Sequence, residues 1–156
     1  MRWSLVAALA AFTLMAGCVE GLGAVEKIRN NVDQFEYGGN FYGKDGTKTF
    51  AWETTGTVAA VNWGTANAES GSVKVTVKDA AGTTVYTGTL KAGAKAVQVA
   101  DGVTGTGTSQ YSKTGTAGDW TVEVTFTDYT GLMGVSLAKK GREYETSAEP
   151  SDAPQA

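Results

Sequence analysis

The sequence predicts an all-β protein, an antiparallel two-sheet β-sandwich of about seven strands. Short segments in which apolar and polar residues alternate are typical of strands with one buried face. The 156 residues include 21 glycines, which separate these segments, and only two prolines, Pro150 and Pro154. No helical period is found between the expected strands, so they should pack as two antiparallel layers. A small closed barrel is the alternative.

The first seventeen residues have the pattern of a signal peptide, which would form a helix ahead of the sandwich. Arg2 supplies a positive charge, Leu5 to Leu14 is apolar, and small residues precede Cys18, the only cysteine of the chain. The apolar run is shorter than the roughly 20 residues that a membrane-spanning helix needs. We therefore expect residues 1–17 to direct export rather than to span a membrane.

The segment Leu14-Met15-Ala16-Gly17-Cys18 resembles the lipobox of prokaryotic membrane lipoproteins, with Met15 where leucine is usual. The resemblance implies cleavage between Gly17 and Cys18 and a diacylglyceryl thioether on Cys18, with an amide-linked chain such as palmitate. Two or three acyl chains anchor a protein stably. The alternative is an ordinary secretory signal cut at Ala16 or Gly17, which would leave an incidental thiol.

Residues 18–47 are expected to form a lipidated N-terminal spacer followed by an aromatic loop. Apolar residues between 19 and 35 recur at intervals of three and four, which would place them on one face of a helix. Glycines and an asparagine pair weaken that helix. The segment is either a spacer between membrane and domain, helical or not, or a helix lying on the sandwich or the lipid surface. The spacer is favoured because the polar face is not especially basic. Glu36 to Thr47 contains several glycines and is expected to be a loop.

Residues 48–141 are expected to form the sandwich. The expected strands are Thr49–Glu53, Val58–Trp63, Val73–Lys78, Thr84–Thr87, Val97–Val99, Trp120–Thr127 and Met133–Leu137. Turns are expected at residues 79–82 and 128–131, and a long polar loop at residues 101–118. The expected core aromatics are Phe50, Trp52, Trp63, Trp120 and Phe126. Residues 142–156 are acidic and polar, which predicts a disordered tail.

The segment from Gly118 to Val124, followed by Tyr129-Thr130-Gly131, resembles the final hairpin of secreted β-sandwich modules such as jelly-roll and pre-peptidase C-terminal-like domains. That resemblance implies an adhesion, carbohydrate-binding or accessory role. It extends over about twenty residues and is shared by many sandwiches.

Composition excludes several functions. The net charge is −3, and the thirteen Lys and Arg residues are scattered, so nucleic acid is not an expected partner. The chain has no histidine, which excludes Ser-His-Asp and Cys-His catalysis. The acidic residues are too dispersed to predict a calcium site or a pair of catalytic carboxylates. We therefore expect no catalytic residues, no metal and no cofactor.

The candidate ligand-binding residues are Tyr37, Phe41 and Tyr42 among glycines, with Tyr111 in the polar loop. Exposed aromatic rings can stack on sugars or anchor a protein partner. The alternative is that these rings close the core.

The expected function is that of a lipid-anchored cell-envelope protein facing the periplasm or the exterior. Its role would be structural or binding and non-catalytic, with the membrane as one partner and a glycan or an envelope protein as another. A carbohydrate- or ligand-binding surface module is the first alternative and an enzyme the second.

Overall fold

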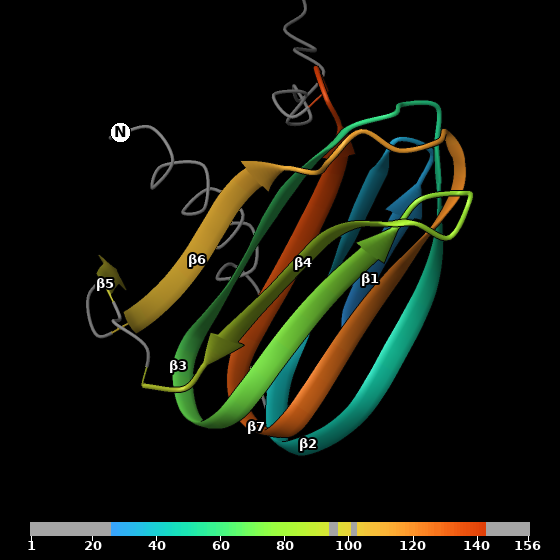
Figure 1. Cartoon of the computed structure of the whole chain (residues 1–156). Helices are drawn as coiled ribbons and strands as arrows, with labels where there is room; N and C mark the ends of the chain where they lie inside the picture. The colour runs from blue at the N-terminus through green and yellow to red at the C-terminus, as the bar shows by residue number, and fades with distance from the viewer. Residues whose placement is uncertain (1–25, 94–96, 101–102, 143–156) are drawn as a thin grey trace, which may run out of the picture.

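The computed structural model describes residues 26–93, 97–100 and 103–142, and its fold is all-β and antiparallel, as expected (Figure 1). The expected signal peptide, Cys18 and the expected tail from residue 143 lie outside the described residues. The strands are β1 (Lys27–Asn31), β2 (Gln34–Thr54), β3 (Ala59–Lys78), β4 (Thr84–Lys91), β5 (Val97–Ala100), β6 (Val103–Tyr111) and β7 (Gly118–Lys139).

All seven strands belong to one hydrogen-bonded system that folds over into two layers, because β2, β3 and β7 each contribute to both. Sheet I contains β1, residues 34–41 of β2, residues 131–139 of β7, residues 59–66 of β3, β6 and β5. Sheet II contains residues 44–54 of β2, residues 118–130 of β7, residues 70–78 of β3, and β4.

The three long strands bend at the same end of the molecule, the bottom of Figure 1. Register shifts occur between Phe41 and Gly46 in β2 and between Ala66 and Ser72 in β3. Residues with positive φ mark the bends, and they are Gly43, Gly46, Asn67, Gly71, Asp128 and Gly131. Such irregularities increase local bending, which lets one strand cross from sheet I to sheet II. We call this the bend end. The opposite end, where the β1–β2, β2–β3, β3–β4 and β6–β7 connections lie, is the loop end.

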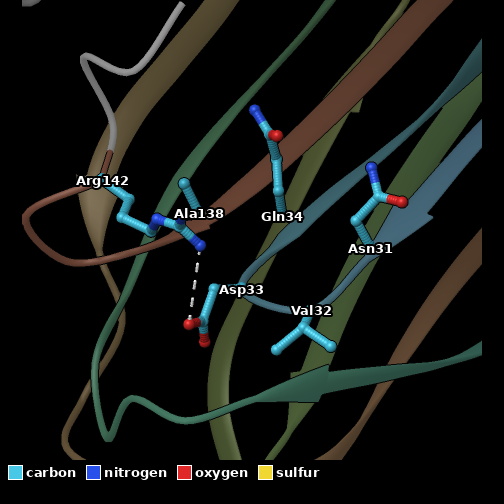
Figure 2. A pocket seen from close by; sticks show the side chains of 6 residues that line it. All are labelled: Asn31, Val32, Asp33, Gln34, Ala138 and Arg142. Atoms are coloured by element: carbon cyan, nitrogen blue, oxygen red, sulfur yellow. Dashed lines mark ion pairs between the residues drawn. The ribbon is translucent and has the colours of Figure 1, made fainter.

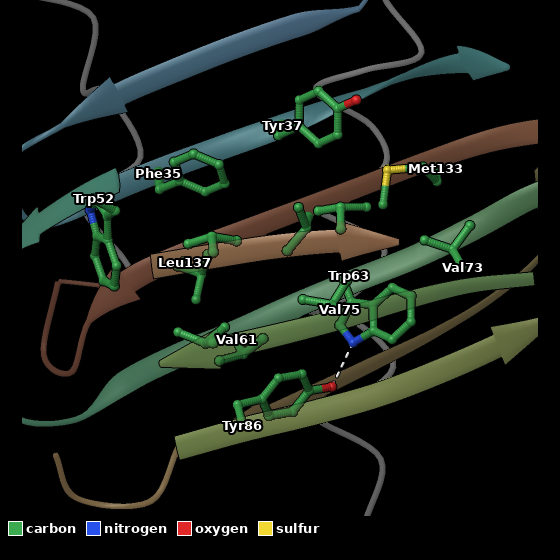
Figure 3. Close-up of a cluster of buried hydrophobic side chains, with 14 of the residues drawn as sticks. Phe35, Tyr37, Trp52, Val61, Trp63, Val73, Val75, Tyr86, Met133 and Leu137 are labelled. Carbon is green, nitrogen blue, oxygen red and sulfur yellow. Dashed lines mark hydrogen bonds between the residues drawn. The ribbon is translucent and has the colours of Figure 1, made fainter. Parts of the chain in front are cut away.

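The core lies between the two layers and is rich in aromatic side chains (Figure 3). Trp52, Trp63, Trp120 and Phe126 are at most 2% exposed, which confirms them as core residues, and Phe50 is partly buried against them. The rings of Trp52 and Trp120 meet edge to face, with centroids 5.7 Å apart. Apolar burial of this kind is the main favourable contribution to folding.

The helix considered for residues 19–35 is wrong for the part that the structure describes. Lys27–Asn31 is strand β1, and a turn with Asp33 at φ 65° leads into β2. Two of the apolar residues that suggested a helical face, Ile28 and Val32, are 56% and 46% exposed. The loop expected at residues 36–47 is also strand, so the sandwich begins at Lys27 rather than at residue 48.

Two further connections differ from expectation. The segment Asp128–Gly131 does not reverse the chain, because β7 continues from Gly118 to Lys139 and pairs with β2 and β3 on both sides of it. The long polar loop expected at residues 101–118 contains strand β6, which pairs with β3. Its threonines and glycines did not suggest a strand because few of its side chains are apolar.

Candidate functional site

The outer face of sheet I carries a row of glycines that crosses four neighbouring strands. Gly38 is opposite Gly134, Gly134 is opposite Gly64, and Gly64 is opposite Gly107. Residues directly opposite one another in antiparallel strands point to the same face. Because the neighbouring inward positions in β2, β7 and β3 are core residues, this row points to the outer face. Gly107 is exposed and Gly134 is half-buried, whereas Gly38 and Gly64 are buried.

A row of polar side chains lies next to the glycines, toward the loop end. Glu36 is opposite Ser136, which is opposite Asn62, which is opposite Ser109. The Ser109 hydroxyl donates a hydrogen bond to Oδ1 of Asn62. Arg29, on β1, lies 4.0 Å from the Glu36 carboxylate. The arrangement offers donors and acceptors along a line across five strands.

Tyr42 and Tyr111, two of the expected binding residues, are exposed on this face, at opposite ends of it. Tyr42 is 69% exposed near the bend end, where its hydroxyl accepts a hydrogen bond of 2.9 Å from Asn40. Tyr111 is 52% exposed at the loop end, and the Lys140 ammonium lies 5.0 Å from its ring centroid. The two tyrosines therefore do not form a joint site.

Tyr37 and Phe41, the other expected binding residues, are 1% and 2% exposed and belong to the core, so they cannot serve as surface platforms. The alternation Phe35, Tyr37, Phe41 in β2 continues the inward positions of a strand, whereas Tyr42 follows on the outward side. Period-two alternation was present in the sequence there, but the glycines between the aromatic residues suggested a loop.

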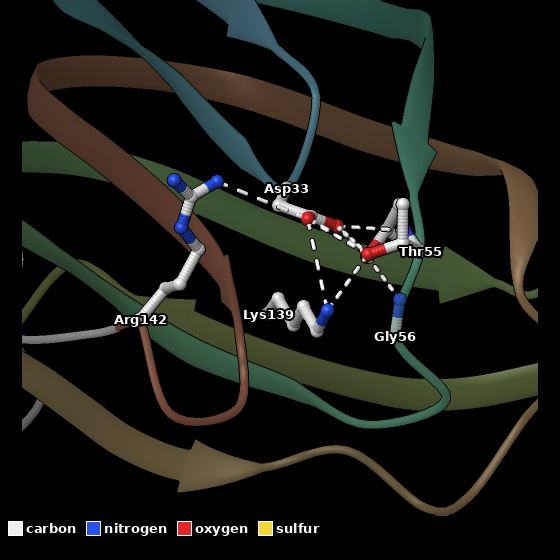
Figure 4. Close-up of polar contacts among 6 residues, drawn as sticks. Asp33, Thr55, Gly56, Lys139 and Arg142 are labelled. Carbon is white, nitrogen blue, oxygen red and sulfur yellow. Dashed lines mark hydrogen bonds and ion pairs between the residues drawn. The ribbon is translucent and has the colours of Figure 1, made fainter.

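The clearest polar cluster of the loop end is built around Asp33, which is 6% exposed (Figure 4). Its Oδ1 accepts hydrogen bonds from the Thr55 amide at 2.6 Å and the Thr54 hydroxyl at 2.9 Å, and its Oδ2 accepts one from the Thr55 hydroxyl at 2.8 Å. Lys139 and Arg142 place cationic nitrogens 3.9 and 3.8 Å from Oδ2. Burial alone would raise the pKa of Asp33, but these hydrogen bonds and the Lys139 charge outweigh it and hold the pKa below its ordinary value.

A shallow pocket of about 200 Å³ lies beside this carboxylate (Figure 2). Its lining residues are Asn31, Val32, Asp33, Gln34, Ala138 and Arg142. Because the Asp33 oxygens are already engaged by Thr54, Thr55 and the two cations, the carboxylate joins the ends of β2 and β7 rather than facing a ligand. We therefore interpret the cluster as structural.

Asp79 performs the same structural role between β3 and β4. Its carboxylate accepts hydrogen bonds from the backbone amides of Thr116, Thr83 and Ala81, at 2.8, 2.8 and 3.1 Å. The Thr116 and Thr83 amides lower the pKa of Asp79 against a smaller opposing effect of burial, and the Ala81 amide adds to the lowering. The carboxylate thus ties the segment before β7 to the β3–β4 turn.

Within the described ranges, no three acidic, cysteine or histidine residues come together in a way that could hold a metal ion. The same part of the chain contains no helix long and apolar enough to cross a bilayer.

Comparison with known proteins adds little to these observations. No protein-family model matches the chain, and no curated protein matches it. Among solved structures, the chain is similar to TmCBM61 in its complex with β-1,4-galactotriose, at 13% sequence identity and a TM-score of 0.44. The alignment covers 82% of this chain and 78% of that one. A likeness this weak does not establish a shared function.

Proposed function

We propose that the protein is a lipoprotein anchored at Cys18, which displays the β-sandwich as a non-catalytic binding or structural domain on the outer side of a membrane. The observation that carries the proposal is the lipobox-like segment Leu14–Cys18, which is followed closely in the sequence by β1 at Lys27. Acylation also accounts for the single cysteine of an exported chain, which cannot form an internal disulfide.

The test is the Cys18→Ala variant, expressed with the full precursor sequence. We expect the variant precursor to remain uncleaved, because it lacks the sulfur that accepts the lipid. It should also appear in the soluble fraction, whereas the wild-type protein should leave the membranes only when detergent is added. Glu20→Ala is the matched control, since it leaves Ala16-Gly17-Cys18 intact and should be processed normally. Normal processing and membrane retention of Cys18→Ala would contradict the proposal.

A second candidate function is the binding of a glycan chain on the outer face of sheet I. It is favoured by one arrangement, in which the polar row of Glu36, Asn62 and Ser109 lies between the glycine row and exposed Tyr111. Sugar rings combine hydroxyl groups with apolar faces, so they suit hydrogen-bonding side chains placed beside an aromatic ring.

Affinity electrophoresis through gels containing different neutral polysaccharides tests this candidate. Tyr111→Ala should weaken retention by about two- to tenfold, because an aromatic contact contributes roughly 0.5–1.5 kcal/mol. Tyr42→Ala, an equally conservative truncation at the other end of the face, serves as the control and should retain binding. A glycan site would be contradicted if Tyr111→Ala were retained as strongly as the wild-type protein. It would also be contradicted if the wild-type protein were not retained in any of the gels.

A further inference from the structure

Strand β1 determines the direction from which the N-terminal segment reaches the sandwich. Lys27 is opposite Gly38 and Asn31 is opposite Gln34, so β1 runs toward the loop end. Glu26, the first described residue, therefore lies at the end of β1 that faces the bends.

Glu26 fixes this entry point near the bends. Its carboxylate oxygens lie 3.6 Å from the Lys44 ammonium and 3.5 Å from the Lys48 ammonium. Both lysines belong to the part of β2 that has just turned into sheet II. Partly exposed ion pairs of this kind contribute little stability each. They nevertheless place residue 26 beside the bends of the long strands.

The chain between Cys18 and Glu26 is short. Residues 19–25 provide eight Cα–Cα steps, which span at most about 28 Å when fully extended. The eight Cα–Cα steps from Gly46 to Thr54 span roughly 27 Å between the bend end and the loop end. A lipid on Cys18 would thus hold the sandwich within about one domain length of the bilayer, and the described chain begins at Glu26 on the bend side.

We propose that the bend end faces the lipid surface, with Tyr42 at the level of the head groups and the loop end directed away. This inference rests on the proposed anchoring at Cys18. Tyr42 is the most exposed of the large hydrophobic side chains in the described part of the chain, at 69%, and it directly precedes the bend residue Gly43. Tyrosine is enriched where a protein meets the membrane interface, because its ring is apolar and its hydroxyl is polar. Tyr111, at the loop end, would then be accessible to a soluble partner.

The test uses the full, acylated protein in vesicles of phosphatidylglycerol and phosphatidylethanolamine that contain a lipid with a nitroxide on its head group. A bimane label is attached in separate samples at Tyr42→Cys and at Lys113→Cys, both exposed positions, the second on the loop end. The acylated Cys18 does not react with the label. We expect the nitroxide to quench the label at position 42 at least several-fold more strongly than the label at position 113.

Three results would overturn the orientation. The first two are equal quenching at the two positions and stronger quenching at position 113. If the protein still floats with the vesicles, either result would disprove the orientation while leaving the anchor intact. Flotation of the Cys18→Ala protein at the wild-type level would disprove the anchor itself, and the orientation with it. Circular dichroism of both labelled variants checks that the sandwich has folded.

Discussion

Trp63 and Tyr86 join the two layers of the sandwich through a hydrogen bond in the core, in which the indole Nε1 donates to the tyrosine hydroxyl at 2.5 Å (Figure 3). Trp63 belongs to sheet I and Tyr86 to strand β4 of sheet II, and they are 2% and 6% exposed. Gly88, on the same strand as Tyr86, leaves the space for this pair, because a Cβ there would lie 2.7 Å from the hydroxyl.

Removing this hydroxyl should destabilise the protein. Tyr86→Phe would leave the Trp63 indole N–H buried without its acceptor, which costs about 1–3 kcal/mol. Urea unfolding followed by tryptophan fluorescence measures the difference. Tyr42→Phe is the matched control, since Tyr42 is exposed, and should stay within about 0.5 kcal/mol of wild type. If the two variants had equal free energies of unfolding, the hydrogen bond between Trp63 and Tyr86 would make no net contribution to stability.

The same substitution at Tyr37 should have the opposite sign or no effect. Tyr37 is 1% exposed, and its hydroxyl has no partner in hydrogen-bonding geometry among the described residues. Burial, and then the negative charge of the Glu26 carboxylate, raise the pKa of this hydroxyl well above its ordinary value. The carboxylate is close enough to add a weak polar contact to that effect, but it lies outside hydrogen-bonding geometry. Because Tyr37→Phe removes a buried polar group that is not satisfied, we expect it to be neutral or stabilising by up to about 1 kcal/mol. A loss comparable to that of Tyr86→Phe in the same urea experiment would show that the hydroxyl has a partner.

Asp33 should make the stability of the protein fall in acid. Its pKa is lowered in the folded state, so its carboxylate stabilises the fold at pH values above the ordinary aspartate pKa of about 3.9. This contribution is lost as the pH falls through the lower folded-state pKa. Asp33→Asn should therefore cost roughly 1.5–3 kcal/mol at pH 7, and progressively less as the pH falls through the lowered folded-state pKa, because the wild-type carboxyl then becomes neutral as well.

Thermal unfolding of both proteins from pH 7 down to pH 2 measures this convergence. The control is Asp119→Asn, which neutralises an exposed carboxylate at the same end of the sandwich. A constant stability difference between wild type and Asp33→Asn over the whole range would contradict the role given to the charge.

Gly71 and Gly82 provide a matched test of the bends. Both have positive φ, 74° and 82°, but a Cβ on Gly71 would clash with the carbonyl oxygens of Thr127 and Asp128, whereas one on Gly82 meets nothing within 4 Å. Gly82→Ala should cost about 1–2 kcal/mol, the usual strain of a left-handed residue. Gly71→Ala should cost clearly more, because the bends of β3 and β7 would have to separate. Equal urea midpoints for the two variants would show that the close approach of these bends is not needed.

Two of the candidate binding residues show which feature of the site the sequence could not predict. Phe41 and Tyr42 are neighbours of similar type, yet one is 2% and the other 69% exposed. Sequence identifies such rings as candidates but does not determine which of two adjacent residues faces inward where glycines obscure the alternation. The glycine row also could not be anticipated, because it depends on the register of β2, β7, β3 and β6, and register is set by pairing over the whole sheet.

The sequence by itself determined the fold class and most of the core, since alternation such as that from Trp120 to Phe126 separates a buried from an exposed face. Only the tertiary structure decided that β2, β3 and β7 bend from one layer to the other. A segment such as Asp128–Gly131 has the residues of a hairpin turn, and its local conformation is compatible with either a reversal or a bend. The choice was made by β2 and β3, which continue alongside β7 beyond the bend and provide hydrogen-bond partners for its second half.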